Sequence, residues 1–342
     1  MIMAELEKIA FHSSDRTLDV EMADMNYYVT LFDSGYLTRG LALYNSLLAT
    51  GEIFTLFIVA FDDLAYDILV RLNLKQARII SLYDFEGERL LAVKPDRTRQ
   101  EYSWTCGSFS ILYILENFNV PQVTYLDADT YFWSKPSLLL DELKAAGRDV
   151  LITEHRYTEE YDQTATSGKF CVQFMTFNNT PAGLKVLNWW CDACEKWCYA
   201  RFEDGKFGDQ KYLDDWETRF ADEVYVLKNI GGGVAPWNVQ QYSVTGGPKV
   251  NGEQVVFFHF HALKCLAANK FDLSQYKLDS AVIKYIYQPY VLALKAALAE
   301  IKAVAPDFSE RYTKPQTAID KIRYAKECLK RRLKGTYNVV EW

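Results

Sequence analysis

The sequence lacks any apolar run of the roughly 20 residues that a transmembrane helix needs. It also lacks an excess of positive charge, since its 342 residues carry a net charge of −7. Bulk binding of nucleic acid is therefore disfavoured, because it requires a basic field that displaces counterions from phosphates. The hydrophobic content of 49% and the charged content of 24% are typical of a soluble globular protein. We expect a soluble protein whose contact with a membrane, if any, is peripheral.

Cysteines are scarce and odd in number, seven in all, and the sequence opens without the pattern of a signal peptide. This favours reduced thiols and a cytoplasmic protein, which could also lie at the inner face of the membrane. Cys191, Cys194 and Cys198 share one face of an expected helix. Zinc can use such a stripe, but the fourth ligand is missing and the apolar surroundings favour core packing.

Apolar strand patterns alternate with helical patterns along most of the chain. Strands are expected at 27–32, 53–63, 77–82, 122–129, 149–155, 171–179, 223–229 and 255–261. The first four alternate with a helix that follows a turn at Asp33 and Gly35 and ends at Gly51, and with helices at 64–74 and 102–118. This alternation predicts an α/β fold with a mainly parallel, doubly wound sheet. We divide the chain into a leading segment (1–24), a catalytic domain (25–268) and a helical C-terminal extension (269–342).

Carboxylates follow two of the expected strands, and such sheets bind ligands at the carboxyl ends of their strands. Asp33 follows the first strand, and Asp127 and Asp129 follow a later one in "QVTYLDADTYF". Alternate residues of an extended segment share a face, so these two carboxylates repel unless a cation lies beside them. Magnesium, manganese or calcium suits such oxygen ligands. A polar turn that caps the strand is the alternative.

Four segments together resemble a known family. "YLDADT" resembles the Asp-x-Asp motif of GT-A glycosyltransferases, and "TLFDSGYLTRGLALYNSL" is similar to the first strand and helix of the retaining, family 8-like members. "FGDQKYLDDW" and "FFHFHALK" resemble the downstream motifs of that group. The likeness runs over about residues 27 to 265 and is closest to bacterial enzymes of surface-polysaccharide type. It implies a GT-A fold, which is Rossmann-like, with helices on both sides of the sheet.

The resemblance also implies roles for individual residues. Asp127, Asp129 and His259 would bind Mn²⁺ (or Mg²⁺), which holds the diphosphate of a nucleotide-sugar donor. The other implied donor-binding residues are Asp33 and Tyr36 at the nucleoside, Asp129 again near the ribose, and Lys264 at the diphosphate. Asp209 and Gln210 would face the transferred sugar as the catalytic residues. His259 and His261 lie on one face of their strand, and neutral imidazole is a good manganese ligand.

The chain departs from the family pattern at three positions. Cys171 and Gln173 stand where relatives carry Asn and Gly, so we expect Gln173 to contact the donor and alter its pocket. Ala262 replaces a Gly of the histidine motif. The glycine-rich segment 231–238 lacks the spacing of a dinucleotide fingerprint and is expected to form a flexible loop beside the site.

These observations predict a metal-dependent hexosyltransferase that uses a nucleotide-diphosphate sugar, a UDP-sugar first, and acts with retention on the hydroxyl of a glycan or lipid-linked glycan. The alternatives are a non-catalytic nucleotide-sugar-binding partner protein and a nucleotidyltransferase, although "FDSGYLTRG" is a poor phosphate loop. Residues 320–335 hold seven Lys or Arg and recurrent apolar positions. They form either a helix that contacts an anionic membrane or a packed helix with a solvated basic face.

Overall fold

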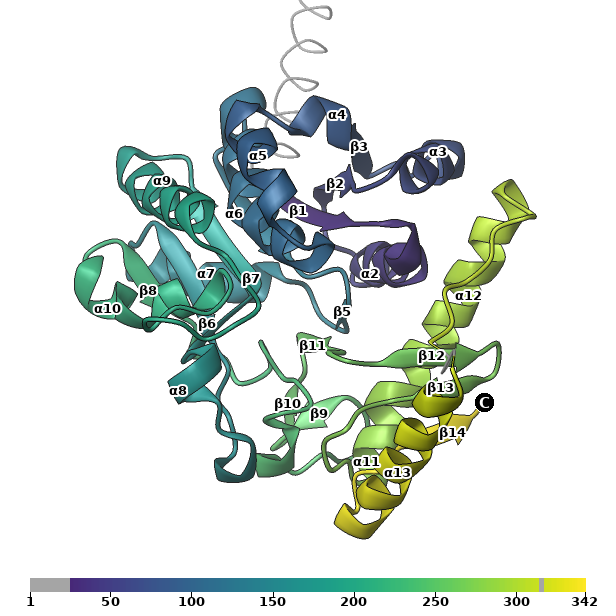
Figure 1. Ribbon diagram of the computed structural model, residues 1–342. Coiled ribbons are helices and arrows are strands. Elements are labelled where there is room, and N and C mark those ends of the chain that lie inside the picture. The colour runs from purple at the N-terminus through teal and green to yellow at the C-terminus, as the bar shows by residue number, and fades with distance from the viewer. Residues whose placement is uncertain (1–24, 314–316) are drawn as a thin grey trace, which may run out of the picture.

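A computed structural model describes residues 25–313 and 317–342 (Figure 1), and the predicted leading segment lies outside these residues. Its centre is a seven-stranded sheet. In spatial order the strands are β3 (Ala77–Ser81), β2 (Phe54–Ala60), β1 (Asn26–Phe32), β4 (Gln122–Leu126), β7 (Phe170–Asn178), β6 (Val150–Glu154) and β8 (Val224–Val226). Six strands run in one direction and β7 runs against its neighbours β4 and β6. The predicted α/β fold with a mainly parallel sheet is confirmed.

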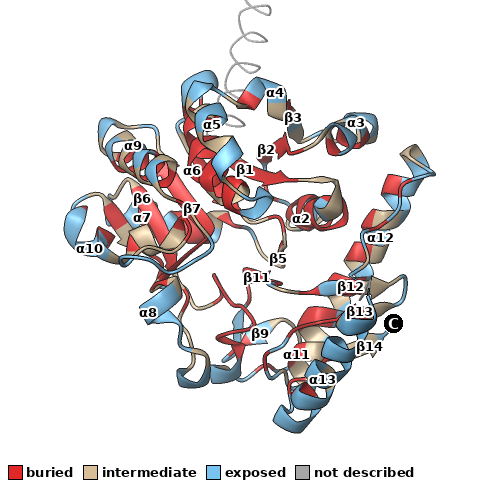
Figure 2. Ribbon diagram, in the orientation of Figure 1, coloured by how far each residue is buried: buried red, intermediate tan, exposed pale blue. Residues whose placement is uncertain are grey.

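Helices cover both faces of the sheet because side chains of successive strand residues point to opposite faces. From β1, Val29 and Leu31 pack into a core with α6 and α9, whereas Tyr28 and Phe32 pack into a second core with α2, α3, α7 and α12. Figure 2 shows these strands buried between the helices. The main helices are α2 (Leu37–Ala49), α3 (Asp63–Leu72), α5 (Glu88–Val93), α6 (Arg99–Asn117), α7 (Ser137–Ala146), α9 (Pro181–Lys196) and α12 (Gln288–Val304). Shorter helices and turns are α4 (Leu82–Phe85), α8 (Thr164–Ser167), α10 (Trp216–Arg219) and α11 (Ser280–Val282), with η1 (Ser34–Tyr36), η2 (Lys94–Asp96), η3 (Glu159–Tyr161), η4 (Gln210–Asp215) and η5 (Val239–Gln241).

One expected strand joins a different sheet. Strand β11 (Phe257–His259) pairs antiparallel with β5 (Thr130–Phe132), the short strand that follows the two aspartates, and the two lie side by side in Figure 1. A further small sheet contains β12 (Lys264–Ala267), β13 (Lys270–Asp272) and β14 (Val339–Glu341), and β9 (Lys249–Val250) pairs with β10 (Glu253–Gln254). Strand β11, which contains His259, therefore lies directly against the turn that contains Asp127 and Asp129, called the aspartate turn below.

The C-terminal region is mainly helical, as predicted, but its first long helix is not uniform. The π-helical turn η6 (Ile283–Tyr287) lies between α11 and α12, and Pro289 follows it near the start of α12. Proline has no N–H group for the helical hydrogen bond, which explains a local change of winding there. Ala297 and Ile301 of α12 are buried in the core that contains α2. The predicted boundary at residue 268 stays a prediction.

The cysteines expected on one helix face pack into the interior, but only Cys191 and Cys194 belong to α9, because the helix ends at Lys196 before Cys198. Cys191, Cys194 and Cys198 are fully buried in the same core as α6, and burial raises the pKa of the Cys191 thiol to about 12. Such protonated thiols behave as small apolar side chains. Among the helices of residues 25–313 and 317–342, none has the combined length and apolar character to cross a membrane.

Candidate metal centre

The two aspartates lie in a tight turn at the carboxyl end of β4, next to the switch point between β1 and β4. Backbone hydrogen bonds fix the turn: the Asp127 N–H donates to the Gln173 carbonyl at 3.2 Å, and the Phe260 N–H donates to the Asp129 carbonyl at 2.9 Å. The Thr130 N–H also donates to the Asp127 carbonyl at 3.1 Å. The side chains of Asp127 and Asp129 remain 28% and 13% exposed. Strand β7 and the residue that follows β11 (Phe257–His259) thus hold two accessible carboxylates at one edge of the sheet.

His259 completes a group of three potential metal ligands. Its Nε2 atom lies 3.2 Å from Asp129 Oδ1 and 3.7 Å from Asp127 Oδ2, and one donor atom from each residue lies within 4.8 Å of the others. The family resemblance implied that these three residues lie together, and the structure brings them together. Two carboxylates and an imidazole are hard and borderline ligands of the kind that manganese and magnesium accept.

Gln173 contacts Nδ1 of His259, the ring nitrogen other than the one that faces the carboxylates. Its Oε1 atom lies 2.8 Å from His259 Nδ1, and both residues are buried. With the amide oxygen facing Nδ1, the imidazole keeps a proton on Nδ1, so Nε2 is the ring nitrogen that faces the carboxylates. The predicted direct contact of Gln173 with a donor stays a prediction, whereas its contact with His259 was not expected.

The electrostatics of the three side chains favour positive charge beside the two carboxylates. Burial tends to raise the pKa of both aspartates, but the facing His259 holds the pKa of Asp129 at about 2. The pKa of Asp127 is raised by burial, which His259 only partly offsets. Burial would lower the pKa of His259, yet Asp129 outweighs it and raises that pKa well above the usual value. In the metal-free protein an imidazolium therefore supplies positive charge, and a divalent cation could replace its proton.

Asp127 also interacts with Tyr125 and with a further carboxyl group, that of Asp209. The Tyr125 hydroxyl donates to Asp127 Oδ1 at 3.1 Å. Asp209 is 6% exposed, and burial, followed by the charge of Asp127, raises its pKa to about 7. Gln210 instead donates its amide to the Ser167 carbonyl at 2.8 Å. Asp209 thus belongs to the electrostatic surroundings of the candidate metal, and the catalytic roles predicted for Asp209 and Gln210 stay predictions.

The end of β1 lies on the other side of the turn. Arg99, at the start of α6, forms ion pairs with Asp33 (2.8 Å) and with Asp62 (3.1 Å), which follows β2. Negative charge on Asp129 is the main reason that the pKa of Tyr36 rises to about 12, so these two side chains are neighbours. The predicted nucleoside residues Asp33 and Tyr36 therefore lie at the same edge as the aspartate turn.

Arg39 was missed at the sequence level. Its guanidinium carbon lies 4.6 Å from the centre of the Tyr36 ring, and its Nη2 donates to the Leu263 carbonyl at 3.0 Å. The side chain is buried although arginine is among the residues most often exposed. Its place within an apolar helical pattern was the available signal, because a charged residue there needs a buried partner.

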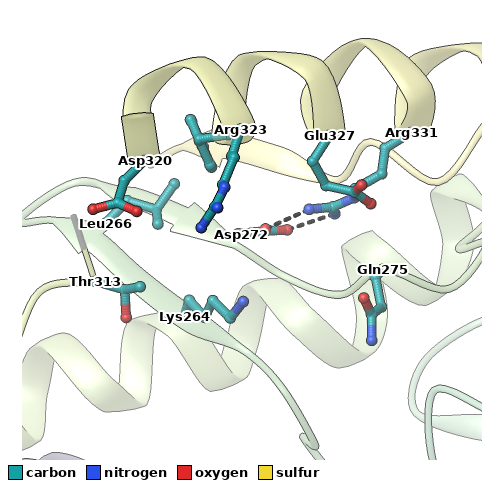
Figure 3. A pocket seen from close by; sticks show the side chains of 10 residues that line it. Lys264, Leu266, Asp272, Gln275, Thr313, Asp320, Arg323, Glu327 and Arg331 are labelled. Atoms are coloured by element: carbon teal, nitrogen blue, oxygen red, sulfur yellow. Dashed lines mark hydrogen bonds and ion pairs between the residues drawn. The ribbon is translucent and has the colours of Figure 1, made fainter. Parts of the chain in front are cut away.

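Lys264 lies in a different environment from the one that its predicted role requires. Its side chain lines a cavity of about 280 Å³. Figure 3 shows this side chain beneath the C-terminal helix, from which Arg323 reaches toward it. Asp272 and Gln275 also line this cavity. The contact of Lys264 with a diphosphate stays a prediction. It requires the lysine side chain to turn toward Asp127, Asp129 and His259.

The glycine-rich segment lies beside the site, as expected, but it is closely packed rather than open. The Val234 carbonyl accepts a hydrogen bond from the His259 N–H at 2.9 Å. The Trp237 ring stands edge-on to the rings of His259 and His261, with centroids 5.4 and 5.6 Å apart. Ala262, where a Gly was expected, has a φ of +62°, the left-handed conformation that favours Gly.

Comparison with known proteins adds to this geometry. No family model matches the chain. Two uncharacterized proteins of Bacillus subtilis (strain 168) are similar to it. YfnD is 27% identical over 298 residues, covering 84% of this chain and 94% of the relative, and YfnF is 26% identical over 294 residues, covering 82% and 96%.

A solved structure identifies the fold. The glycosyltransferase GlyE of Streptococcus pneumoniae TIGR4 superposes with a TM-score of 0.50 at 14% identity, covering 89% of this chain and 72% of that chain. The protein has a GT-A glycosyltransferase fold. In this GT-A fold the Asp127–Asp129 turn occupies the carboxyl end of β4, the edge at which α/β sheets bind ligands.

Proposed function

We propose that the protein is a metal-dependent glycosyltransferase that moves a hexose from a nucleotide-diphosphate sugar, a UDP-sugar first, to the hydroxyl of a glycan or lipid-linked glycan, with retention at the sugar. The observation that carries the proposal is the convergence of Asp127, Asp129 and His259 at the switch point of a GT-A fold. Donor atoms within 4.8 Å of one another, drawn from a strand end and a separate small sheet, form a preorganised cation site.

Each group has a task in such a reaction. A bound Mn²⁺ or Mg²⁺ would supply positive charge to the departing nucleoside diphosphate. Asp33 and Tyr36 would hold the nucleoside at the end of β1. Asp209 would face the sugar, where a carboxylate stabilises the positive charge that develops at the anomeric carbon. Burial favours the neutral form of Asp209, so a neighbouring cation would help to ionise it.

Donor hydrolysis tests the proposal directly. Wild-type protein with Mn²⁺ is expected to hydrolyse one member of a panel of UDP- and GDP-sugars, and EDTA is expected to stop it. Asp127→Asn and Asp129→Asn should lower the rate by about 100-fold or more, because each removes a charged ligand. The matched control is Asp67→Asn, an exposed aspartate of α3. Equal rates in the three variants would exclude the metal assignment.

The alternative is a non-catalytic nucleotide-sugar-binding partner protein, and the residues that favour it are Cys171 and Gln173. Both are buried, they stand where relatives carry Asn and Gly, and Gln173 contacts His259. Titration calorimetry separates the two functions. Donor binding without turnover on any acceptor would support the alternative, whereas turnover that depends on Asp127 would exclude it.

A further inference from the structure

Helix α13 (Ala318–Lys334) turns its apolar side chains toward solvent. Ile319, Ile322, Leu329 and Leu333 are 62%, 58%, 61% and 82% exposed. Their spacing of three, seven and four residues places them on one face, because a helix advances 100° per residue. Figure 2 shows the helix exposed along its length. An apolar row on a surface helix ordinarily packs on the core, and this row does not.

The opposite side of α13 docks on the protein through polar groups. Arg331 forms two hydrogen bonds with Asp272 of β13, at 2.6 and 2.7 Å, and donates to the carbonyls of Ser274 and Thr336 at 2.6 and 3.0 Å. The two charged side chains are 9% and 7% exposed, and Figure 3 shows their bonds. A bidentate, buried pair fixes the rotation of the helix about its axis. The orientation that exposes the apolar row is therefore set by the fold.

Positive charge borders the apolar row. Lys326, Lys330 and Lys334 recur every four residues and are all exposed, so they form a second row beside the first. Among the described residues, the ion pair recorded for this lysine row is a 4.0 Å contact between Lys330 and Glu327. The helix is thus strongly basic although the chain as a whole carries −7.

We propose that α13 lies flat on an anionic membrane surface, with its apolar row at the boundary between headgroups and acyl chains and its lysine row against the lipid phosphates. Apolar burial and charge attraction act together at such a surface. A second copy of the chain is a poorer occupant, because a symmetric contact through this face would bring two lysine rows together. This surface does not depend on the sugar chemistry proposed above.

Vesicle co-sedimentation of the full-length protein tests the surface. The protein is expected to bind mixed phosphatidylcholine/phosphatidylglycerol vesicles at least about tenfold more tightly than pure phosphatidylcholine vesicles, and added salt should weaken this binding. Leu329→Gln with Leu333→Gln should weaken it by about tenfold or more, because two exposed leucines no longer enter the bilayer. The control is Leu292→Gln, a leucine of α12 that is 57% exposed, which should bind as wild type.

A charge variant gives an independent reading. The double variant Lys326→Glu with Lys330→Glu should lose the preference for anionic vesicles. The control Lys75→Glu changes an exposed lysine that lies outside α13 and should keep this preference. Absence of vesicle binding by the wild type, or unchanged binding by the leucine variant, overturns the proposal. Light scattering that shows a dimer lost in the leucine variant would also overturn it, in favour of self-association. Asp127→Asn should bind vesicles normally, so a failed sugar reaction and a failed membrane contact are distinguishable.

Discussion

At the scale of single residues, the side chain that most changes the picture of the site is Gln173. It was expected at the donor, but its amide faces His259 Nδ1 at 2.8 Å, and the carbonyl of the same residue accepts the Asp127 N–H. One residue therefore contacts two of the three potential ligands. Such outer partners orient ligating histidines and fix which nitrogen is free.

Replacing Gln173 should weaken metal binding without touching a ligand. Gln173→Leu is expected to lower the affinity for Mn²⁺ by about 10- to 100-fold, because His259 loses the acceptor that fixes its proton. Gln173→Glu keeps an acceptor and should lose less. Calorimetric titration with Mn²⁺ measures both variants, after circular dichroism has shown that they fold. Wild-type affinity in the leucine variant would mean that His259 is oriented by its backbone alone.

A second residue, Glu52, should make stability depend on pH. Its side chain is buried and accepts hydrogen bonds from the Tyr28 and Ser137 hydroxyls at 3.3 and 3.1 Å, and burial raises its pKa above the usual value. An acid whose folded pKa is raised contributes stability at low pH and loses that contribution as pH rises through the folded pKa. We expect the free energy of unfolding of wild type, relative to Glu52→Gln, to fall with rising pH. Urea unfolding of both proteins across a pH series measures this difference in the free energy of unfolding. A difference that does not change with pH would contradict the prediction.

At the scale of elements, the site depends on how the glycine-rich segment supports β11. Val234 forms a parallel bridge with Phe258, and Gly233 precedes it with a φ of +79°. A Cβ at Gly233 would lie 2.6 Å from Thr153 Cγ2 and 3.1 Å from Gln173 Nε2. The loop, β6 and β7 are thus packed against one another behind His259.

Gly233→Ala should therefore cost both stability and metal affinity. We expect about 2 to 3 kcal/mol of destabilisation, from the left-handed φ and from overpacking together. Gly246→Ala is the matched control, since its φ is +67° but nothing lies within 4 Å of its Cβ. It should cost about 1 kcal/mol and leave Mn²⁺ binding unchanged. Chemical unfolding and metal titration of the pair would contradict this account if the two variants behaved alike.

Particular elements show how far the sequence could predict the structure. The buried strands and the aspartate turn were found because their patterns are local: short continuous apolar runs, then paired carboxylates. The pairing of β11 with β5, the contact of Gln173 with His259 and the ion pairs of Arg99 were not found. Each depends on strand register between distant segments, which no local pattern encodes. Lys264 illustrates the same limit, because the cavity that it lines is closed by a helix some 60 residues later.

At the scale of the whole molecule, ligand binding should stabilise the fold by mass action. At a Mn²⁺ concentration of about 100 times its dissociation constant, the free energy of unfolding is expected to rise by about 2.7 kcal/mol, and EDTA should reverse the gain. Asp127→Asn should lose most of this response, whereas Asp67→Asn should keep it. Thermal unfolding with and without Mn²⁺ measures the effect, and equal shifts in both variants would place the cation elsewhere.

The three potential metal ligands lie far apart along the chain, and this separation has a consequence for the rate of folding. Gln173 and His259 are 86 positions apart, and β11 is placed against the aspartate turn by the small sheet that it forms with β5. Contacts that close such long loops form late in folding, because their entropy cost is met only when most of the structure is in place. In refolding, Mn²⁺ capture should consequently lag behind the burial of tryptophan, so that the cation reports completion of the chain's tertiary structure rather than its collapse.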